Sequence, residues 1–303
     1  MRGMTSRSFL ILGACAALAS CGASPPTRDP LAALALAEEA VRAGKGDQVA
    51  GWLQRIDPES YVGEDRERYR LAVGTALYQS GSLWQAHRQL RDFPQDHPFS
   101  QLLGQVEELE YRIGSELMRS EGGFLFFTSD AEDGRVVLED FIVRFPRSRS
   151  LPDALHLLGD QAFQERRFQL ARERYSQLVA ERPDSEWATL ARFRIAMSRY
   201  LDLQGAEYDQ VQTQMAHNEL RDFLAAGPEN PTMREEAQAA MTVTRHWLAE
   251  KRLLIADYYH RIGVPEAERR QLELAAAEYA DTPAGQKAAG RLKAAAPDAP
   301  EHR

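Results

Sequence analysis

The stretch of sequence that decides the fold is residues 152–185, PDALHLLGDQAFQERRFQLARERYSQLVAERPDS. Apolar and small residues recur in it at spacings of three and four, which is the period of one face of an α-helix. Those of the first half are Leu155, Leu158, Gly159 and Ala162, and those of the second half are Ala171, Tyr175 and Leu178. Pro183 closes the stretch. The pattern predicts two helices that lie antiparallel and approach closely where Gly159 and Ala171 stand.

This spacing is similar to that of the tetratricopeptide repeat, a helical hairpin of 34 residues. Gly159, Ala171 and Tyr175 occupy positions 8, 20 and 24 of such a unit. The same register returns earlier in the chain, where Gly74 and Ala86 are again twelve residues apart. A fixed period of this length predicts a solenoid, because one hairpin cannot bury its apolar stripe alone.

Other units keep the register with changes. Two of them carry an insertion of eight residues between their helices, and Ala196 and Ala216 are the small residues of the second. The last unit, residues 249–282, has Glu268 where the best units have alanine and Ala280 where they have proline. We therefore expect about five repeats.

The sequence predicts an all-α protein, a tetratricopeptide-like solenoid that coils as a right-handed superhelix. The repeats are expected at residues 67–292, preceded by a degenerate helical cap at residues 31–66. We also expect a flexible tether at residues 21–30, which is rich in proline, and a disordered tail at residues 293–303.

The N-terminus has the order of a secretory signal peptide, which we assign to residues 1–20. Arg2 and Arg7 precede an apolar run that is shorter than the roughly 20 residues a transmembrane helix needs. The signal ends in Leu-Ala-Ser-Cys at Cys21, which resembles the lipobox of bacterial lipoproteins, and in that family the cysteine sulfur carries diacylglycerol. Removal of the signal would discard Cys15 and leave Cys21 as the single cysteine.

Composition disfavours several classes of function. The formal charge of -8 argues against nonspecific nucleic-acid binding, which needs a cationic face. The seven histidines form no His-Glu-x-x-His motif, and neither a glycine-rich phosphate loop nor a Gly-x-Ser-x-Gly elbow occurs. We expect no enzymatic activity, no metal and no cofactor other than the covalent lipid on Cys21.

Three segments carry a closer resemblance to one known family. They are Gly159-Asp-Gln-Ala-Phe163, Ala191-Arg-Phe-Arg-Ile-Ala196 and Ile255-Ala-Asp-Tyr-Tyr259. Together with the lipobox they resemble the BamD family, the lipoproteins of the outer-membrane beta-barrel assembly machinery. The resemblance is most specific between about Leu151 and Leu292, whereas the N-terminal third matches only in the register of its repeats.

The resemblance implies a lipid-anchored scaffold on the periplasmic face of the outer membrane. Gly22, rather than aspartate, follows the cysteine, which in this class implies sorting to the outer membrane. The implied partners are the barrel subunit of the assembly machinery and unfolded outer-membrane proteins. We expect residues 249–292 to dock the barrel subunit and the concave face of residues 67–183 to receive extended substrate.

Other lipoproteins of the bacterial envelope share the lipobox and the repeats. A pilotin for a secretin, a coordinator of peptidoglycan synthesis and a scaffold for polysaccharide export are the alternatives that the sequence leaves open. Only the identity of the bound partner separates them from the assembly scaffold.

An aromatic cluster lies in the first insertion, after two glycines. Phe124, Phe126 and Phe127 either pack into the core between repeats or form an exposed contact for a partner or the membrane surface. Both interpretations stay open at the level of the sequence.

Overall fold

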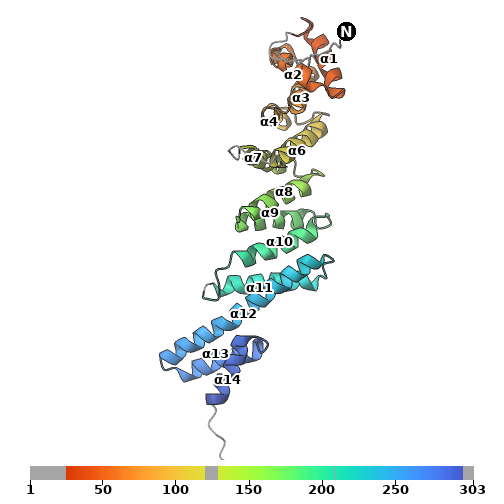
Figure 1. The fold of residues 1–303 in the computed structure, drawn as a ribbon. Coiled ribbons are helices and arrows are strands. Elements are labelled where there is room, and N and C mark those ends of the chain that lie inside the picture. The colour runs from red at the N-terminus through yellow and green to blue at the C-terminus, as the bar shows by residue number, and fades with distance from the viewer. Residues whose placement is uncertain (1–24, 120–128, 208, 296–303) are drawn as a thin grey trace, which may run out of the picture. The chain divides into compact units, whose positions relative to one another are not determined.

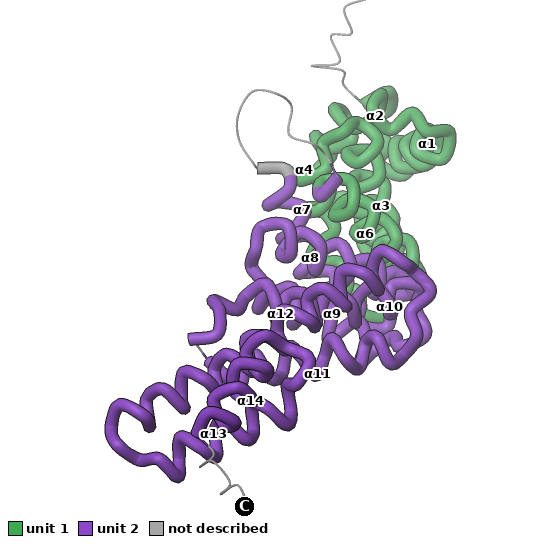
Figure 2. Tube along the Cα trace, turned by 60° about the horizontal axis from the view of Figure 1, so that its bottom comes forward, with its two compact units in different colours: residues 1–117 green, residues 118–303 purple. Residues whose placement is uncertain are grey.

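The structure, a computed structural model, describes residues 25–119, 129–207 and 209–295. Every regular element in these ranges is a helix, which confirms the predicted all-α class. The chain divides into two compact units, unit 1 up to Leu117 and unit 2 from Met118 onward (Figure 2).

Unit 1 is built of short helical hairpins. Its elements are α1 (Pro30–Arg42), α2 (Gly46–Leu53), the 3₁₀ helix η1 (Pro58–Ser60), α3 (Glu64–Gln79), α4 (Leu83–Leu90), α5 (Phe93–Asp96) and α6 (Leu103–Arg119), which runs two residues past the boundary. α1 packs against α2 and α3, and α3 packs against α4. The Asp29 side chain caps α1 by accepting a hydrogen bond from the N–H of Leu31, and Pro30 begins the helix.

Unit 2 continues the hairpins. Its elements are α7 (Ser129–Arg144), α8 (Leu151–Gln164), α9 (Phe168–Glu181), α10 (Ala188–Leu201), α11 (Gln210–Ala225), α12 (Pro231–Arg261), α13 (Pro265–Glu278) and α14 (Pro283–Ala295). From α7 to α14 each helix packs against the next (Figure 1). Packing between consecutive helices is the mark of a solenoid, so the described helices confirm the predicted repeat architecture.

The hairpin turns use a left-handed backbone. Gly81 has a φ of 79° between α3 and α4, and Gly263 has a φ of 72° between α12 and α13. Arg166 takes the equivalent place between α8 and α9 with a φ of 59°. Glycine adopts this conformation without steric cost, whereas a residue with a Cβ is strained in it. The turn is thus set by the packing of the two helices, even where the residue disfavours it.

The predicted start of the last repeat lies inside one long helix. The last repeat was expected to begin at residue 249, but α12 is continuous over the 31 residues Pro231–Arg261. Proline stands only at its first turn, where the missing N–H costs nothing, and no glycine interrupts it. α12 contributes Ala237 to one buried cluster and Leu248 to the next, so the last two hairpins share a helix.

The second helix of the first full repeat is interrupted. Ala86, Leu90 and Phe93 keep the spacing of one helix face, and all three are fully buried, but α4 ends at Leu90 and α5 begins at Phe93. Pro94 explains the break, because its ring lacks an N–H and clashes with the carbonyl four residues earlier, that of Leu90.

The ends of the predicted domains also shift. α3 begins at Glu64, three residues before the expected start of the repeats, and α1 takes in Pro30 from the expected tether. α14 extends to Ala295, so the first three residues of the expected tail are helical. Its start is fixed by Pro283 and by Thr282, whose hydroxyl accepts a hydrogen bond from Gly285 N–H at 3.0 Å.

Candidate protein-binding surfaces

The small residues singled out in the sequence lie at helix contacts. The four alanines are at most 1% exposed: Ala86, Ala171, Ala196 and Ala216. A Cβ built on Gly74 would lie 2.6 Å from Cγ of Leu90, the residue on the facing helix α4. Because real Cβ atoms do not approach other carbons so closely, α3 and α4 can pack at this distance only with glycine there.

Gly159 plays the same part between α8 and α9. A Cβ at this position would lie 2.8 Å from Cε1 of Tyr175, which is itself fully buried. The Tyr175 hydroxyl donates a hydrogen bond to the Asp160 carboxylate. Burial, together with this carboxylate, raises the pKa of Tyr175 above its ordinary value. The phenol therefore stays neutral and serves as a donor that joins the two helices.

Polar and aromatic side chains continue this contact onto α10. The His156 ring stacks on Trp187, with ring centroids 3.8 Å apart. Trp187 Nε1 donates to Asp153 Oδ1 at 2.6 Å. The Arg194 guanidinium lies over the Phe163 ring, 4.2 Å from its centroid. Helices α8 and α10 are thereby joined by stacking and hydrogen bonds rather than by apolar packing alone.

The same cluster contains a histidine and an aspartate, His156 and Asp160, whose side-chain types can bind a metal ion. His156 Nε2 lies 3.5 Å from Asp160 Oδ2, one helical turn away. Among the residues that the structure describes, no group of three or more histidine, cysteine or acidic side chains gathers where it could hold a metal ion. The pair is explained by its packing against Trp187 and Tyr175.

His156 gives the solenoid a dependence on pH. Burial is the largest effect on its pKa and lowers it below 6.5, although Asp160 and Asp153 act in the opposite direction. Because the folded state binds this proton more weakly than the unfolded state, stability should fall as the pH drops below about 6.5. We expect the melting temperature to decrease between pH 7.5 and pH 5.5, and the decrease to be smaller in His156→Phe, which keeps the stack. An equal decrease in both proteins would show that His156 is not responsible.

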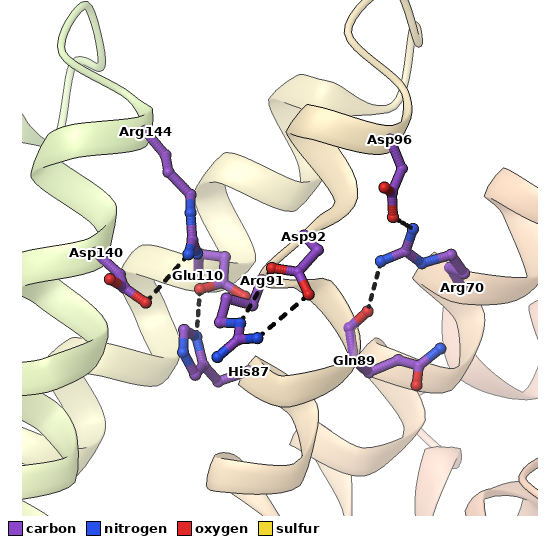
Figure 3. Close-up of polar contacts among 9 residues, drawn as sticks. All are labelled: Arg70, His87, Gln89, Arg91, Asp92, Asp96, Glu110, Asp140 and Arg144. Carbon is purple, nitrogen blue, oxygen red and sulfur yellow. Dashed lines mark hydrogen bonds and ion pairs between the residues drawn. The ribbon is translucent and has the colours of Figure 1, made fainter.

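Unit 1 contains a buried polar pair of its own. His87 on α4 and Glu110 on α6 are 1% and 2% exposed, and His87 Nδ1 lies 2.7 Å from Glu110 Oε2 (Figure 3). Nearby, Arg70 on α3 reaches Asp96 Oδ2 at 2.5 Å and the Gln89 carbonyl at 3.3 Å. These contacts join α3 to α4 and α5, and they join α4 to α6.

Near the C-terminus, Arg291 on α14 contacts both helices of the last hairpin, α12 and α13. Arg291 donates to Asp257 on α12 at 2.5 Å and to Glu268 on α13 at 2.7 Å. His260 Nδ1 lies 2.9 Å from the other oxygen of Glu268. Hydrogen bonds from His260 and Arg291 lower the pKa of Glu268, which therefore stays ionised. Glu268, the residue that departs from the repeat pattern, thus forms the contact that holds α14 against α13.

A groove of about 880 Å³ lies beside these contacts of Arg291. It runs between α13 and α14, and its wall is lined by apolar Leu272, Leu292 and Pro265 together with Arg269 and Arg291. Glu268 and Glu273 also line the groove and pair with Arg291 and Arg269, so the rim carries both charges. An apolar floor with a polar rim of this kind suits a peptide segment that inserts apolar side chains.

The C-terminal half of α12 carries an exposed apolar stripe. Leu254, Tyr258 and Ile262, the residue that directly follows α12, are spaced by four and so continue one face of the helix. Their exposed fractions are 38%, 51% and 52%. Neither α13 nor α14 covers them, although both pack against α12. Exposed apolar residues in a row are a common feature of protein interfaces.

A family model decides the class of the protein. The model of the YfiO family, described as an outer membrane lipoprotein, matches residues 63–296. The chain belongs to this outer membrane lipoprotein family. YfiO proteins are a BamD-like family of non-catalytic repeat lipoproteins, which confirms the predicted relationship at the level of the family. No curated protein matches the chain significantly.

The extent of the YfiO match follows the helices. It begins at Gly63, the residue that precedes α3, and continues through the whole of α14. The match to the YfiO family therefore covers three features: the contacts of Arg291, the groove between α13 and α14, and the α12 stripe. α1 and α2 precede the match.

Several predictions fall outside the described residues. They concern the signal peptide at residues 1–20, Cys21, expected to carry the lipid, and the aromatic cluster of Phe124, Phe126 and Phe127. They stay predictions. Within the described ranges, no helix has the length and apolar character needed to cross a membrane.

Sequence reasoning missed two features of the YfiO surface. The α12 stripe has residues spaced by four, a helical pattern that also describes a buried face, so the sequence could not distinguish exposed from buried. Arg291 gave no signal by itself, whereas Glu268 did, because a carboxylate at a position that otherwise takes a small residue indicates an unusual neighbour.

Proposed function

We propose that this protein is a non-enzymatic scaffold of the outer-membrane beta-barrel assembly machinery. Lipid on Cys21 would hold it at the periplasmic face of the outer membrane, and its repeats would bind the barrel subunit and unfolded barrel proteins. The observation that carries the proposal is the YfiO match over residues 63–296, which takes in every predicted repeat.

The C-terminal hairpin is the proposed docking site for the barrel subunit. Its α12 stripe offers Leu254, Tyr258 and Ile262 as apolar anchors. Arg261 directly precedes Ile262, is exposed and adds positive charge beside them. A partner segment with apolar side chains and a negative rim would complement this surface, and binding would require no chemical step.

The docking surface can be tested with a matched pair of triple variants. We expect Leu254→Ser, Tyr258→Ser and Ile262→Ser together to reduce recovery of the barrel subunit at least about tenfold, because truncating interface anchors costs about 2 kcal/mol or more. The control replaces three exposed apolar residues elsewhere in unit 2: Val143→Ser, Val211→Ser and Met215→Ser.

The measurement is an affinity pull-down of the lipidated protein from solubilised envelopes, with mass spectrometry of the partners. Both variants should keep the helical circular dichroism and melting temperature of the unaltered protein, since the replaced side chains are exposed. Equal recovery from both variants would remove the α12 stripe from the proposal. Recovery of a different envelope complex by the unaltered protein would refute the assembly function itself.

The alternative proposal is another scaffold role in the envelope. A secretin pilotin, a coordinator of peptidoglycan synthesis or a polysaccharide-export scaffold would share the lipid anchor and the repeats. The same pull-down distinguishes them, because each predicts a different protein: a secretin, a peptidoglycan synthase or an export channel.

A further inference from the structure

Unit 1 exposes apolar side chains at the end where its first helix begins. Leu31 is 55% exposed, Val62 is 78% exposed and Phe99 is 96% exposed. An isolated exposed leucine is ordinary, but an almost fully exposed phenylalanine near two exposed aliphatic residues suggests a contact that the isolated chain does not satisfy.

Hydrogen bonds bring the three residues to the same end of unit 1. The Tyr61 hydroxyl, next to Val62, donates to the Pro30 carbonyl at 2.9 Å, and Pro30 directly precedes Leu31. Val62 in turn lies two residues before the first residue of α3.

Phe99 is held at the same end of α3. Its neighbours His97 and Ser100 both contact Glu67 in the first turn of α3, at 3.4 Å and 2.6 Å. Val62 and Phe99 therefore flank the N-terminal end of one helix.

The turn that contains Phe99 does not need an apolar residue. It reads Pro98-Phe99-Ser100, and the corresponding turns of other repeats place a charged residue between proline and serine, Arg147 in one and Asp184 in another. A charged side chain therefore suits the turn, and the phenylalanine contributes almost nothing to the core because it is 96% exposed.

The position of the proposed lipid limits what can meet this edge. Nine peptide steps separate Cys21 from Pro30, and a chain of that length spans at most about 30 Å when fully extended. If the lipid on Cys21 is inserted in a membrane, Pro30 always lies within that distance of the lipid surface, and Leu31, the first residue of the exposed edge, directly follows it.

A weak contact is sufficient under these conditions. A short tether keeps the edge near the membrane at an effective concentration of about 1 mM. An apolar contact that is too weak to hold an untethered protein on the membrane would therefore still form. The surrounding charge selects the lipid. Six carboxylates outnumber three guanidinium groups around the edge: Asp29, Asp57, Glu59, Glu64, Asp65 and Glu67 against Arg28, Arg66 and Arg68. An electrically neutral headgroup layer is therefore favoured over an anionic one.

We propose that this edge of unit 1 rests on the zwitterionic membrane surface that holds the lipid anchor, with Val62 and Phe99 inserted among the headgroups. The inference rests on the proposed anchor at Cys21. It gives the protein a second membrane contact besides the lipid, and this contact orients unit 1 on the bilayer.

The test uses an environment-sensitive fluorophore. Phe99→Cys gives one labelling site, because Cys21 would be blocked by lipid and Cys15 removed with the signal. On phosphatidylcholine vesicles we expect the emission of a nitrobenzoxadiazole label at this site to rise and shift to the blue. The control is Gln85→Cys, an exposed position on α4 near the opposite end of α3, whose label should keep its aqueous emission.

Two further comparisons examine the chemistry of the contact. The first comparison places the label at Val62→Cys and adds Phe99→Ser. We expect the equilibrium between membrane-bound and free edge to shift about tenfold toward the free state, because the added change removes an aromatic ring that is partly buried in the membrane. Replacing part of the phosphatidylcholine by phosphatidylglycerol should reduce the label's response. A response that increases with anionic lipid would overturn the proposed neutral surface.

A second experiment tests the membrane contact independently of the proposed lipid on Cys21. The chain from Gly22 onward, with a hexahistidine tag in place of the lipid, is tethered to nickel-chelating phosphatidylcholine vesicles. Failure of the full-length protein to float with vesicles would refute the lipid anchor, whereas the tagged chain still tests the edge. An aqueous label at Phe99→Cys in the tethered chain would overturn the membrane contact. A blue shift that appears only when envelope proteins are added would assign the edge to a protein partner instead.

Discussion

Replacing Glu110 with alanine should lower the free energy of unfolding of unit 1 by about 1–3 kcal/mol or more, the cost of leaving a buried polar group without its hydrogen-bond partner. Glu110 and His87 are almost completely buried, and their side chains meet at 2.7 Å. The variant would leave the His87 ring in the interior without the carboxylate, and it would also create a cavity at the contact of α4 and α6.

The measurement is hydrogen exchange of the α4 and α6 amides, which reports the opening free energy of this part of the chain. The matched control is Glu59→Ala, which removes the partner of Arg66 from an exposed pair in the same unit. We expect the control to cost less than about 1 kcal/mol. The double variant His87→Leu with Glu110→Leu should recover much of the loss, since replacing both partners of a buried hydrogen bond by apolar groups can be nearly neutral. A similar small loss in Glu110→Ala and Glu59→Ala would show that the buried pair is not a principal contact.

Replacing Gly285 with alanine should release α14 from the last hairpin. The added Cβ would overlap the Tyr279 carbonyl oxygen and lie 3.0 Å from the Ala275 carbonyl oxygen. Both obstacles are backbone atoms, which cannot rotate away as a side chain can. The helix must therefore move, at a cost of about 1–3 kcal/mol or more, and the contacts of Arg291 with Asp257 and Glu268 would be weakened with it.

Gly290→Ala in the same helix is the control. A Cβ at Gly290 meets no atom within 4 Å, so this change should stabilise α14 by about 0.5–1 kcal/mol through helix propensity alone. Hydrogen exchange of the α14 amides should accelerate in Gly285→Ala and slow in Gly290→Ala. Equal protection of α14 in both variants would contradict the close packing at Gly285. Loss of α14 would also remove one wall of the C-terminal groove, so partner recovery with Gly285→Ala tests whether that groove takes part in binding.

The fold of this protein followed from local patterns in the sequence. Gly159 and Ala171 mark close helix contacts because only small residues permit them, and that requirement is visible in a single chain. The spacing of glycine, alanine and proline repeats with the hairpin, so it indicated the solenoid before any contact was known. The lipobox at Cys21 is likewise local, and the match to the YfiO family supports the class of lipoprotein that it predicted.

The tertiary structure decided which side chains meet and which stay exposed. Leu248 and Leu254 have the same chemistry on one helix, yet Leu248 is 1% exposed and Leu254 is 38% exposed. Glu268 departed from the pattern in the sequence, but its partner Arg291 lies 23 residues away on a helix that follows the last repeat. Helical periodicity is a local property of the backbone and is written in consecutive residues. Pairing between side chains on different helices depends on how those helices pack, so only the folded chain determines it.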